Sequence, residues 1–235
     1  MDLDAAKLDA LVAELPTGDA RALAIPGDIT DPAACASAVS ATLAHFGALD
    51  GLINSAGISH RSLLAATDPA VIRRVMDVNF FGTANLTCAA LPRIIAGQGF
   101  IVVISSVAGF APLTGRTGYA ASKHALHGFF DSLRTEVEAA GVGVTLVCPS
   151  FIRTGIGAAA IDGSGLPVSS PRVTTGGEST PEEIAVRIFD AVAVGQHLLL
   201  PDATSRKAWW LSRLAPRIYA RIMKRRVGEE FAGLI

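Results

Sequence analysis

The stretch "GFIVVISSVAG", residues 99–109, is the strongest indicator of the fold class. It begins as an unbroken apolar run of strand length, which is typical of a β-strand buried on both faces. Comparable runs lie at "ALAIPGD" (22–28), "LDGLINSAG" (49–57), "VGVTLVCPS" (142–150) and "HLLLP" (197–201). Continuous apolar strands that alternate with helices predict an α/β domain with a parallel sheet covered on both faces.

Helical patterns separate these runs. The segment "DPAACASAVSATLAHFG" (31–47) predicts an alanine-rich helix, and residues about 68–95 predict a long helix with a break near Pro92. A third helix, about 117–140, should end at Gly141, where a C-cap glycine belongs. Residues 155–180 are rich in Gly, Ser, Pro and Thr, which indicates a flexible insertion or lid.

The composition excludes several classes of protein. The 235 residues suit one large α/β domain, and 50% hydrophobic against 17% charged residues can bury a sizeable core. A formal charge of −1 gives no global attraction to nucleic acid. The three cysteines lie far apart and read as small core residues, without the spacing of a metal site. No signal peptide and no membrane-spanning run is recognisable, so we expect a soluble, cytoplasmic protein.

Unusual residues cluster where the predicted strands end. The segments "GDIT", "NSAG", "ISSVAG" and "CPSFIRT" each follow a strand. Ligands of such sheets bind at the carboxyl ends of the strands. The chemistry is therefore expected just past residue 28 and at 54–57, 105–109 and 149–154.

A tyrosine and a lysine share one helix face in "TGYAASKHALHGF" (117–129). Tyr119 and Lys123 are four residues apart, so their side chains project from the same side. Alone, the pair would read as a surface contact in which the lysine stem covers the ring. The residues that accompany the pair favour a catalytic interpretation.

Together these residues resemble the short-chain dehydrogenase/reductase family, over residues 1 to about 202. Ser106, Tyr119 and Lys123 match the family's serine and Y-x-x-x-K motif, and Asn79 in "VMDVNFFG" matches its helix asparagine. "NSAG" (54–57) resembles the family's NNAG turn, and "PSFIRT" resembles its PG-x-x-x-T turn. The resemblance implies a Rossmann-like, doubly wound parallel sheet in three αβα layers. It also implies an NAD(P)-dependent oxidoreductase that interconverts an alcohol and a ketone or aldehyde.

The implied chemistry explains the catalytic residue types. Hydride reduction of a ketone requires a proton donor at the oxygen. A free tyrosine has a pKa of about 10, and a neighbouring ammonium should lower the pKa of Tyr119. The resemblance assigns Ser106 to the substrate oxygen, Lys123 also to the nicotinamide ribose, and Asn79 to a proton-resupplying water chain. An isolated Asn79 would instead read as a polar residue that bends a helix.

The resemblance also assigns cofactor contacts. They fall on Asp2, Asp28, Ile29, Asn54, Ala56, Gly57, Tyr119, Lys123, Pro149, Ile152 and Thr154. Asp2 would bind the ribose hydroxyls and favour NAD over NADP, Asp28 would lie at the adenine edge, and Thr154 at the carboxamide. The alternative interpretation of Asp28 is an N-cap for the helix that begins near residue 31.

The family's phosphate loop, TG-x-x-x-G-x-G, does not occur in these 235 residues. We therefore expect a sheet without the first βα unit and most of the second strand, in which the 22–28 strand lies beside 50–54 or stays unpaired. The chain is then either part of a longer enzyme or a non-catalytic remnant that serves as a binding subunit. Residues 155–160, "GIGAAA", fit the dinucleotide-binding pattern G-x-G-x-x-A. However, they follow "PSFIRT", and the family has its substrate lid at this place.

The last segment, 203–235, is a basic amphipathic extension. Its cations are Arg206, Lys207, Arg213, Arg217, Arg221, Lys224, Arg225 and Arg226. Its apolar stripe is Trp209, Trp210, Leu214, Ile218 and Ile222, with a kink at Pro216. Such a helix suits a membrane surface, a cover for a lipophilic substrate, or packing on the domain or a partner subunit.

Partners follow mainly from the resemblance. The lid "GIGAAAIDGSGLPV" (155–168) is apolar, which suggests a hydrophobic alcohol or ketone as substrate. The helices at about 68–95 and 117–140 carry many small residues, which permit close helix contact. By resemblance they should pair across a two-fold axis in a homodimer or homotetramer. No nucleic-acid partner and no metal is expected.

Overall fold

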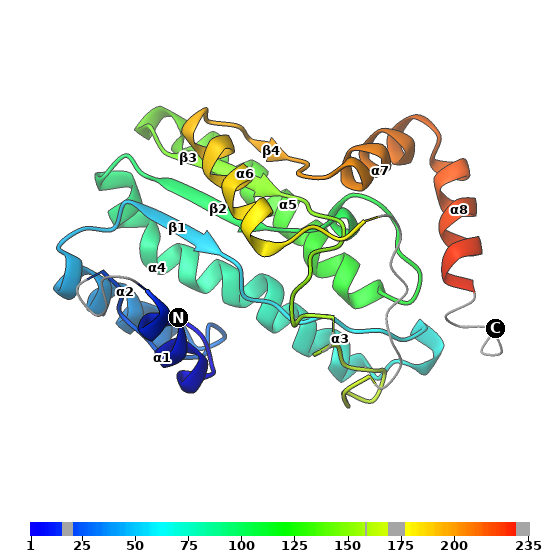
Figure 1. Ribbon diagram of the computed structural model, residues 1–235, viewed down its shortest axis with the longest axis horizontal. Coiled ribbons are helices and arrows are strands. Elements are labelled where there is room, and N and C mark those ends of the chain that lie inside the picture. Colours follow the sequence, from blue (N-terminus) through cyan, green and yellow to red (C-terminus); the bar gives the residue numbers. More distant parts are fainter. Residues whose placement is uncertain (16–20, 158, 169–176, 229–235) are drawn as a thin grey trace.

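The computed structural model describes residues 1–15, 21–157, 159–168 and 177–228. In these residues a parallel sheet of four strands runs in the order β1-β2-β3-β4 (Figure 1). The strands are β1 Gly51–Asn54, β2 Phe100–Ile104, β3 Gly143–Val147 and β4 Leu198–Leu199. All of these predicted strands are confirmed. In the register, Leu52 pairs with Ile101, and Ile101 pairs with Val144.

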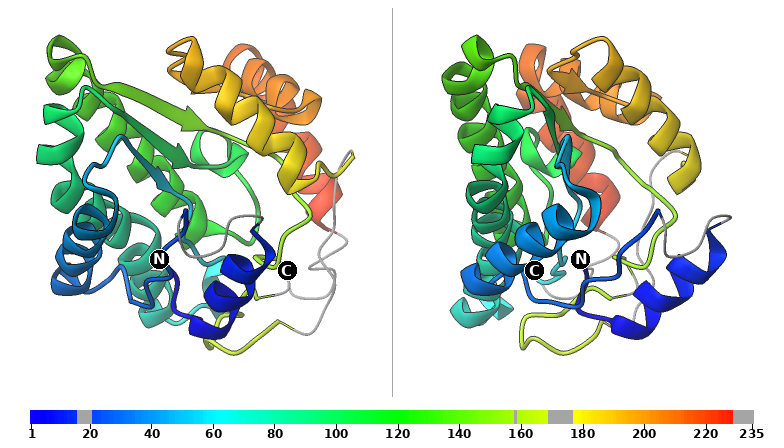
Figure 2. Two further views of the ribbon diagram at one scale, coloured as in Figure 1. Left: turned by 60° about the vertical axis from the view of Figure 1, so that its left-hand side comes forward. Right: turned by 90° about the vertical axis from the view of Figure 1, so that its left-hand side faces the viewer.

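Helices cover both faces of the sheet, as predicted. Helices α2 Pro32–Phe46, α4 Thr83–Ala96 and α5 Thr117–Val137 lie on one face, and α6 Pro181–Ala193 lies on the other (Figure 2). Alternate side chains of β2 point to opposite faces of the sheet and pack against the helices there. Ile101 and Val103 belong to the main core with residues of α4 and α5, whereas Val102 packs with Ala191 of α6. The result is a three-layer αβα domain.

The predicted strand at 22–28 is wrong. Its backbone makes an isolated parallel bridge between Pro26 and Asp2, and the Gly27 N–H donates to the Asp2 carbonyl at 3.0 Å. Pro26 has no N–H to contribute to a ladder. The segment does not pair with β1, which is the edge strand of the described sheet, and Ile53 of β1 is 55% exposed. Of the two expected outcomes, the strand therefore stays outside the sheet.

The predicted break near Pro92 is also wrong, because the long helix changes at residues 77–82. There α3 Pro69–Met76 passes into a π-helix, Asp77–Gly82, and continues as α4. Pro92 lies inside α4 and removes one hydrogen bond to the carbonyl of Cys88, an exposed residue. The exposure of Cys88 also corrects its assignment to the core, whereas Cys35 and Cys148 are buried as predicted.

The predicted helix at 117–140 is confirmed as α5 followed by a 3₁₀ turn at 138–140. Gly141 ends it with a φ of 77°, which is the left-handed C-cap conformation. The sequence reasoning missed α6. Its signal was Thr180, whose side chain forms a capping box with Glu183 just before Pro181 begins the helix.

The C-terminal segment forms two helices, α7 Ala203–Leu214 and α8 Pro216–Gly228, so the predicted change at Pro216 is confirmed. The pair also packs on the domain, because Ala208 and Tyr219 are buried with Ala111. The α1 helix, Ala5–Glu14, begins at Asp4, which caps it. Within the described residues, no helix has both the length and the apolar character to cross a membrane.

Part of the predicted lid is packed rather than open. Ile161 is buried against Val71 and Val75 of α3, and its N–H donates to the carbonyl of Ser59. Residue 158 and residues 169–176 of this segment lie outside the described residues.

Candidate active site

A cavity of about 660 Å³ lies where β1, β2 and β3 end. Ser55 and Gly57 follow β1, Ser105 and Ser106 follow β2, and Pro149 follows β3. Tyr119 and Lys123 reach the same cavity from α5. Three of the four predicted segments thus meet at one place, whereas "GDIT" after residue 28 does not line this cavity.

Ser106 and Tyr119 both line the cavity. Burial raises the pKa of Tyr119, and the neighbouring Ser106 and Arg116 side chains oppose this effect only in part. The expected lowering of the Tyr119 pKa by Lys123 is therefore wrong for this structure. The phenol keeps its proton at neutral pH, which is the form that can donate to a developing alkoxide.

Lys123 is buried, with 4% exposure, and its ammonium is directed at the sheet. Its Nζ donates to the carbonyl of Ile104 at 2.8 Å and lies 5.7 Å from the centre of the Tyr119 ring. Burial lowers the pKa of Lys123 to about 8.

Asn79 occupies the π-helix between α3 and α4 and is fully buried. Its Oδ1 accepts from the Ile58 N–H at 2.8 Å, and its Nδ2 donates to the Ile58 carbonyl at 2.9 Å and to Ser122 Oγ at 3.0 Å. Ser122 Oγ in turn donates to the Tyr119 carbonyl at 2.8 Å. Asn79 thus joins the loop after β1 to the first turn of α5, which carries the tyrosine.

His60 is a site residue that the sequence reasoning missed. It is fully buried, and its Nδ1 accepts from the backbone N–H of Tyr119 at 3.3 Å. Burial and the nearby Arg116 lower the pKa of His60 to about 4, so the imidazole is neutral. Its position directly after "NSAGIS" was the available signal.

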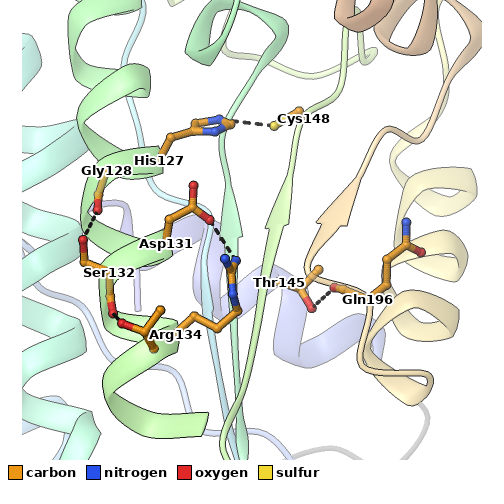
Figure 3. A network of polar contacts seen from close by, with 9 residues as sticks. His127, Gly128, Asp131, Ser132, Arg134, Thr145, Cys148 and Gln196 are labelled. Atoms are coloured by element: carbon orange, nitrogen blue, oxygen red, sulfur yellow. Dashed lines mark hydrogen bonds and ion pairs between the residues drawn. The ribbon is translucent and has the colours of Figure 1, made fainter.

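A second missed group lies behind Lys123. His127 Nε2 contacts Ser105 Oγ at 3.1 Å and Cys148 Sγ at 3.4 Å, and the latter contact is drawn in Figure 3. Ser105 Oγ also donates to the Lys123 carbonyl at 3.4 Å. Burial raises the pKa of Cys148 to about 12 and lowers that of His127 to about 4. These groups hold α5 against β2 and β3 as a neutral network.

The proposed cofactor residues divide into two sets. Gly57, Pro149, Ile152, Thr154, Tyr119 and Lys123 line the cavity. The others, Asp2, Asp28, Ile29, Asn54 and Ala56, do not line it.

The contacts that residues of the second set make lie away from the cavity. The Asp28 carboxylate accepts from the Thr30 N–H at 2.8 Å, and Asp31, not Asp28, caps α2. The Asp2 carboxylate accepts from the Asp4 N–H, and Asn54 Nδ2 donates to Thr87 Oγ1 at 3.1 Å. Ile29 is buried beside Gly82.

The residues around Lys123 fit one half of a dinucleotide. A Cβ built on Gly57 would lie 3.1 Å from Asn79 Oδ1 and 3.8 Å from Lys123 Nζ, so this turn needs a residue without a side chain to stay open beside the lysine. The "GIGAAA" segment does not open a helix in its described part, where residues 155–157 form a turn. It therefore lacks the helix N-terminus of a phosphate-binding fingerprint.

No group of three or more His, Cys, Asp or Glu side chains that could hold a metal ion occurs in the described residues. The polar side chains that line the cavity include Tyr119, Ser106 and Lys123, and also the cations Arg61, Arg116 and Lys207.

Comparison with known proteins agrees with this arrangement. A family model described as short chain dehydrogenase matches residues 1–164. A bovine relative, "Dehydrogenase/reductase SDR family member 7B" of Bos taurus, is 40% identical over 205 residues. The match covers 86% of this chain and 63% of that protein, so the chain spans less than two thirds of the relative.

Solved structures share the fold. A short-chain dehydrogenase/reductase from Burkholderia phymatum in complex with NAD has a TM-score of 0.80 and 23% identity, covering 92% of this chain and 84% of its own. A short-chain dehydrogenase from Burkholderia cenocepacia in complex with NADP has a TM-score of 0.72 and 23% identity, covering 85% and 77%. The extent of the family-model match, with the Rossmann-like fold and the residues at the cavity, shows that this chain belongs to the short-chain dehydrogenase/reductase family.

Proposed function

We propose that the protein is an NAD(P)-dependent oxidoreductase that interconverts an apolar alcohol and the matching ketone or aldehyde. The observation that carries this proposal is the meeting of Tyr119, Ser106 and Lys123 at one cavity. Bound nicotinamide would supply or accept the hydride. The side chains of this chain would orient the substrate oxygen and move its proton.

The proton is handled by Tyr119. Its raised pKa keeps the phenol protonated, and the Ser106 hydroxyl in the same cavity would give the substrate oxygen a second hydrogen-bonding partner. In reduction the phenol donates its proton to that oxygen, and in oxidation the phenolate accepts it. Asn79 and His60 hold the backbone of the turn that carries Tyr119, through Ser122 and the Tyr119 N–H.

The cofactor would lie along Gly57, Lys123 and Thr154. The Lys123 ammonium, now bonded to the Ile104 carbonyl, is the donor available to ribose hydroxyls, and the Thr154 hydroxyl is a partner for the carboxamide. The two structural neighbours were solved with NAD and with NADP. Asp2 favours NAD in this proposal, because a carboxylate repels a 2′-phosphate.

The substrate class follows from the far wall of the cavity. Beyond Tyr119 the lining comes from the loop after β2, the 151–160 segment and the two C-terminal helices, and most of its side chains are apolar, with Arg116 and Lys207 as charged exceptions. The lining residues of this wall include Val107, Leu113, Phe151, Ile156, Leu211, Tyr219, Ile222 and Met223. A ketone or alcohol with an extended apolar group would bury that group against this wall.

Assembly and location complete the proposal. Phe81, at the entry to α4, is 52% exposed, and α4 and α5 carry small residues that allow close approach of a second copy. We propose a homodimer or homotetramer of a cytoplasmic protein, which light scattering on the purified protein would test. A monomer at micromolar concentration would contradict it.

The test of the enzyme proposal is a titration with NADH and NADPH, read by nicotinamide fluorescence, for wild type, Lys123→Ala and the exposed control Lys7→Ala. The proposal predicts saturable binding by wild type and Lys7→Ala and at least tenfold weaker binding by Lys123→Ala. Equal affinity of all three proteins would refute the role given to Lys123. Absence of binding by wild type would favour the alternative of a non-catalytic binding subunit.

A further inference from the structure

The outer side of α7 and α8 exposes large apolar side chains. Trp210 and Leu214 are four residues apart on α7 and are 62% and 77% exposed. Ile218, in the first turn of α8, is 52% exposed. These three residues, which we call the apolar ridge, lie on the two helices that stand beyond the carboxyl ends of the strands (Figure 1).

The apolar ridge is not an unfinished part of the core. The opposite side of the same helices is packed, with Ala208 and Tyr219 buried against Ala111, and Leu211 and Met223 beside them. Trp209 packs edge-to-face against Phe110 with a centroid distance of 4.9 Å. The two helices are therefore held in a fixed orientation on the domain. The apolar stripe that the sequence predicted along this segment is divided between the packed inner side and the exposed apolar ridge.

The two helices that carry the apolar ridge also carry many cations. Arg206, Lys207, Arg213, Arg217, Arg221, Lys224 and Arg225 are exposed side chains of α7 and α8. The sequence from 203 to 228 contains no Asp or Glu, although the whole chain has a formal charge of −1. Arg213 keeps its guanidinium 3.1 Å from the centre of the Trp209 ring. Positive charge is therefore concentrated at this end of the molecule.

We propose that the α7–α8 surface docks on an anionic lipid bilayer, with the apolar ridge inserted at the headgroup boundary. Exposed Trp, Leu and Ile between Lys and Arg side chains match both parts of such a surface, since the rings and branched chains enter the acyl boundary and the cations meet the lipid charges. Trp is favoured at that depth because its ring is apolar and its N–H is polar.

Two other partners fit the α7–α8 surface less well. A second copy that pairs the same surface across a two-fold axis would bring like charges together. Nucleic acid would satisfy the cations but would leave Leu214 and Ile218 without apolar partners. An anionic membrane is the partner that satisfies both.

Docking would bring the cavity to the lipid. The inner side of the same helices contributes Leu211, Tyr219, Ile222 and Met223 to the cavity wall, and the exposed Lys207 lies at the same cavity. An apolar substrate dissolved in the bilayer would then have a short path to the cavity. The docking proposal itself does not depend on the enzyme activity.

Vesicle binding by the full chain tests the proposal, and the chain provides its own reporter. Both tryptophans, Trp209 and Trp210, are on α7. We expect flotation with vesicles of 70% phosphatidylcholine and 30% phosphatidylserine, with a blue shift of tryptophan emission. We expect at least tenfold weaker binding to pure phosphatidylcholine, and release from the anionic vesicles at 1 M salt, where the Debye length falls to about 3 Å.

Matched variants separate the surface from general effects. Each cation at an anionic surface is worth about a fivefold change in affinity, so Arg217→Glu/Arg221→Glu should weaken binding by roughly 25-fold or more. Arg73→Glu/Arg74→Glu on α3 makes the same charge change at another exposed site and should bind like wild type. Leu214→Ala should weaken binding about tenfold, whereas Phe189→Ala, which removes a 75% exposed ring on α6, should not.

The result that would overturn the proposal is vesicle binding that is equal in the Arg217/Arg221 and Arg73/Arg74 variants, or no binding to anionic vesicles by wild type. Binding to double-stranded DNA that is as tight as vesicle binding, without a shift of tryptophan emission, would also overturn it. A circular dichroism melt of each variant verifies that it is folded, and the salt and lipid dependence of wild type requires no variant.

Discussion

The stability of the protein should fall in mild acid because of His60. This imidazole is fully buried, its Nδ1 accepts from the Tyr119 N–H, and its pKa is lowered from 6.5 to about 4. A lowered folded-state pKa means that the unfolded chain takes up the proton first. The contribution of His60 is therefore complete above pH 6.5, declines as the pH falls below 6.5, and is lost near pH 4.

The magnitude follows from the shift. A change of about 2.5 pKa units corresponds to about 3.4 kcal/mol at its limit, since one unit is worth about 1.4 kcal/mol. At pH 5, between the two pKa values, linkage gives a loss of about 2 kcal/mol. This is a large part of the ~5–15 kcal/mol that a domain of ordinary stability has.

The assay is urea unfolding of wild type, His60→Gln and His45→Gln at several pH values from 7.5 to 4.5. The His60→Gln protein cannot titrate at this position, so the free energy of unfolding of wild type should fall relative to it by about 2 kcal/mol between pH 7.5 and pH 5. His45→Gln replaces an exposed imidazole, and its profile should overlay that of wild type. Parallel profiles of wild type and His60→Gln would refute the reasoning.

Three further outcomes are expected. Phe130→Ala, at a fully buried core position, should lower the free energy of unfolding by about 3–5 kcal/mol in urea denaturation, and a loss below 1 kcal/mol would contradict its place in the core. Asn79→Ala should leave the Ile58 N–H and carbonyl without their partners and lower the free energy of unfolding by about 2–4 kcal/mol in the same assay. The control Ser132→Ala, which removes an exposed hydrogen bond, should lower it by less than about 1 kcal/mol. Alcohol oxidation should accelerate as the pH rises through the alkaline range, because the raised Tyr119 pKa limits the phenolate, and a flat pH–rate profile would argue against this.

The sheet was predictable because its signal is local. Runs such as "FIVVI" need burial on both faces wherever they occur, and Gly141 ends α5 through its own backbone freedom. The strand at 22–28 failed because a strand exists only with a partner, and Pro26 cannot complete a ladder. The π-helix was not predictable from propensity, since it forms where Asn79 meets Ile58, 21 residues away.

The candidate site was predictable where motif spacing carries it. Tyr119, Lys123 and Ser106 meet at one cavity, because a helix face and a strand end fix their places. His60 and His127 were missed because their roles come from long-range contacts with the Tyr119 N–H and with Ser105, and the only local signal was the position of His60 directly after "NSAGIS". The Tyr119 pKa was misjudged because the sequence does not reveal how deeply the phenol is buried, and burial raises its pKa.

The measurement that tests the account most directly is the rate of ketone reduction by Tyr119→Phe in parallel with wild type, at saturating NADH or NADPH. The variant keeps the ring and removes the phenolic proton. We predict a loss of roughly 10²–10⁴-fold in rate, with cofactor affinity changed less than about threefold. Retention of more than about a tenth of the wild-type rate would contradict the assignment of Tyr119 as the proton donor.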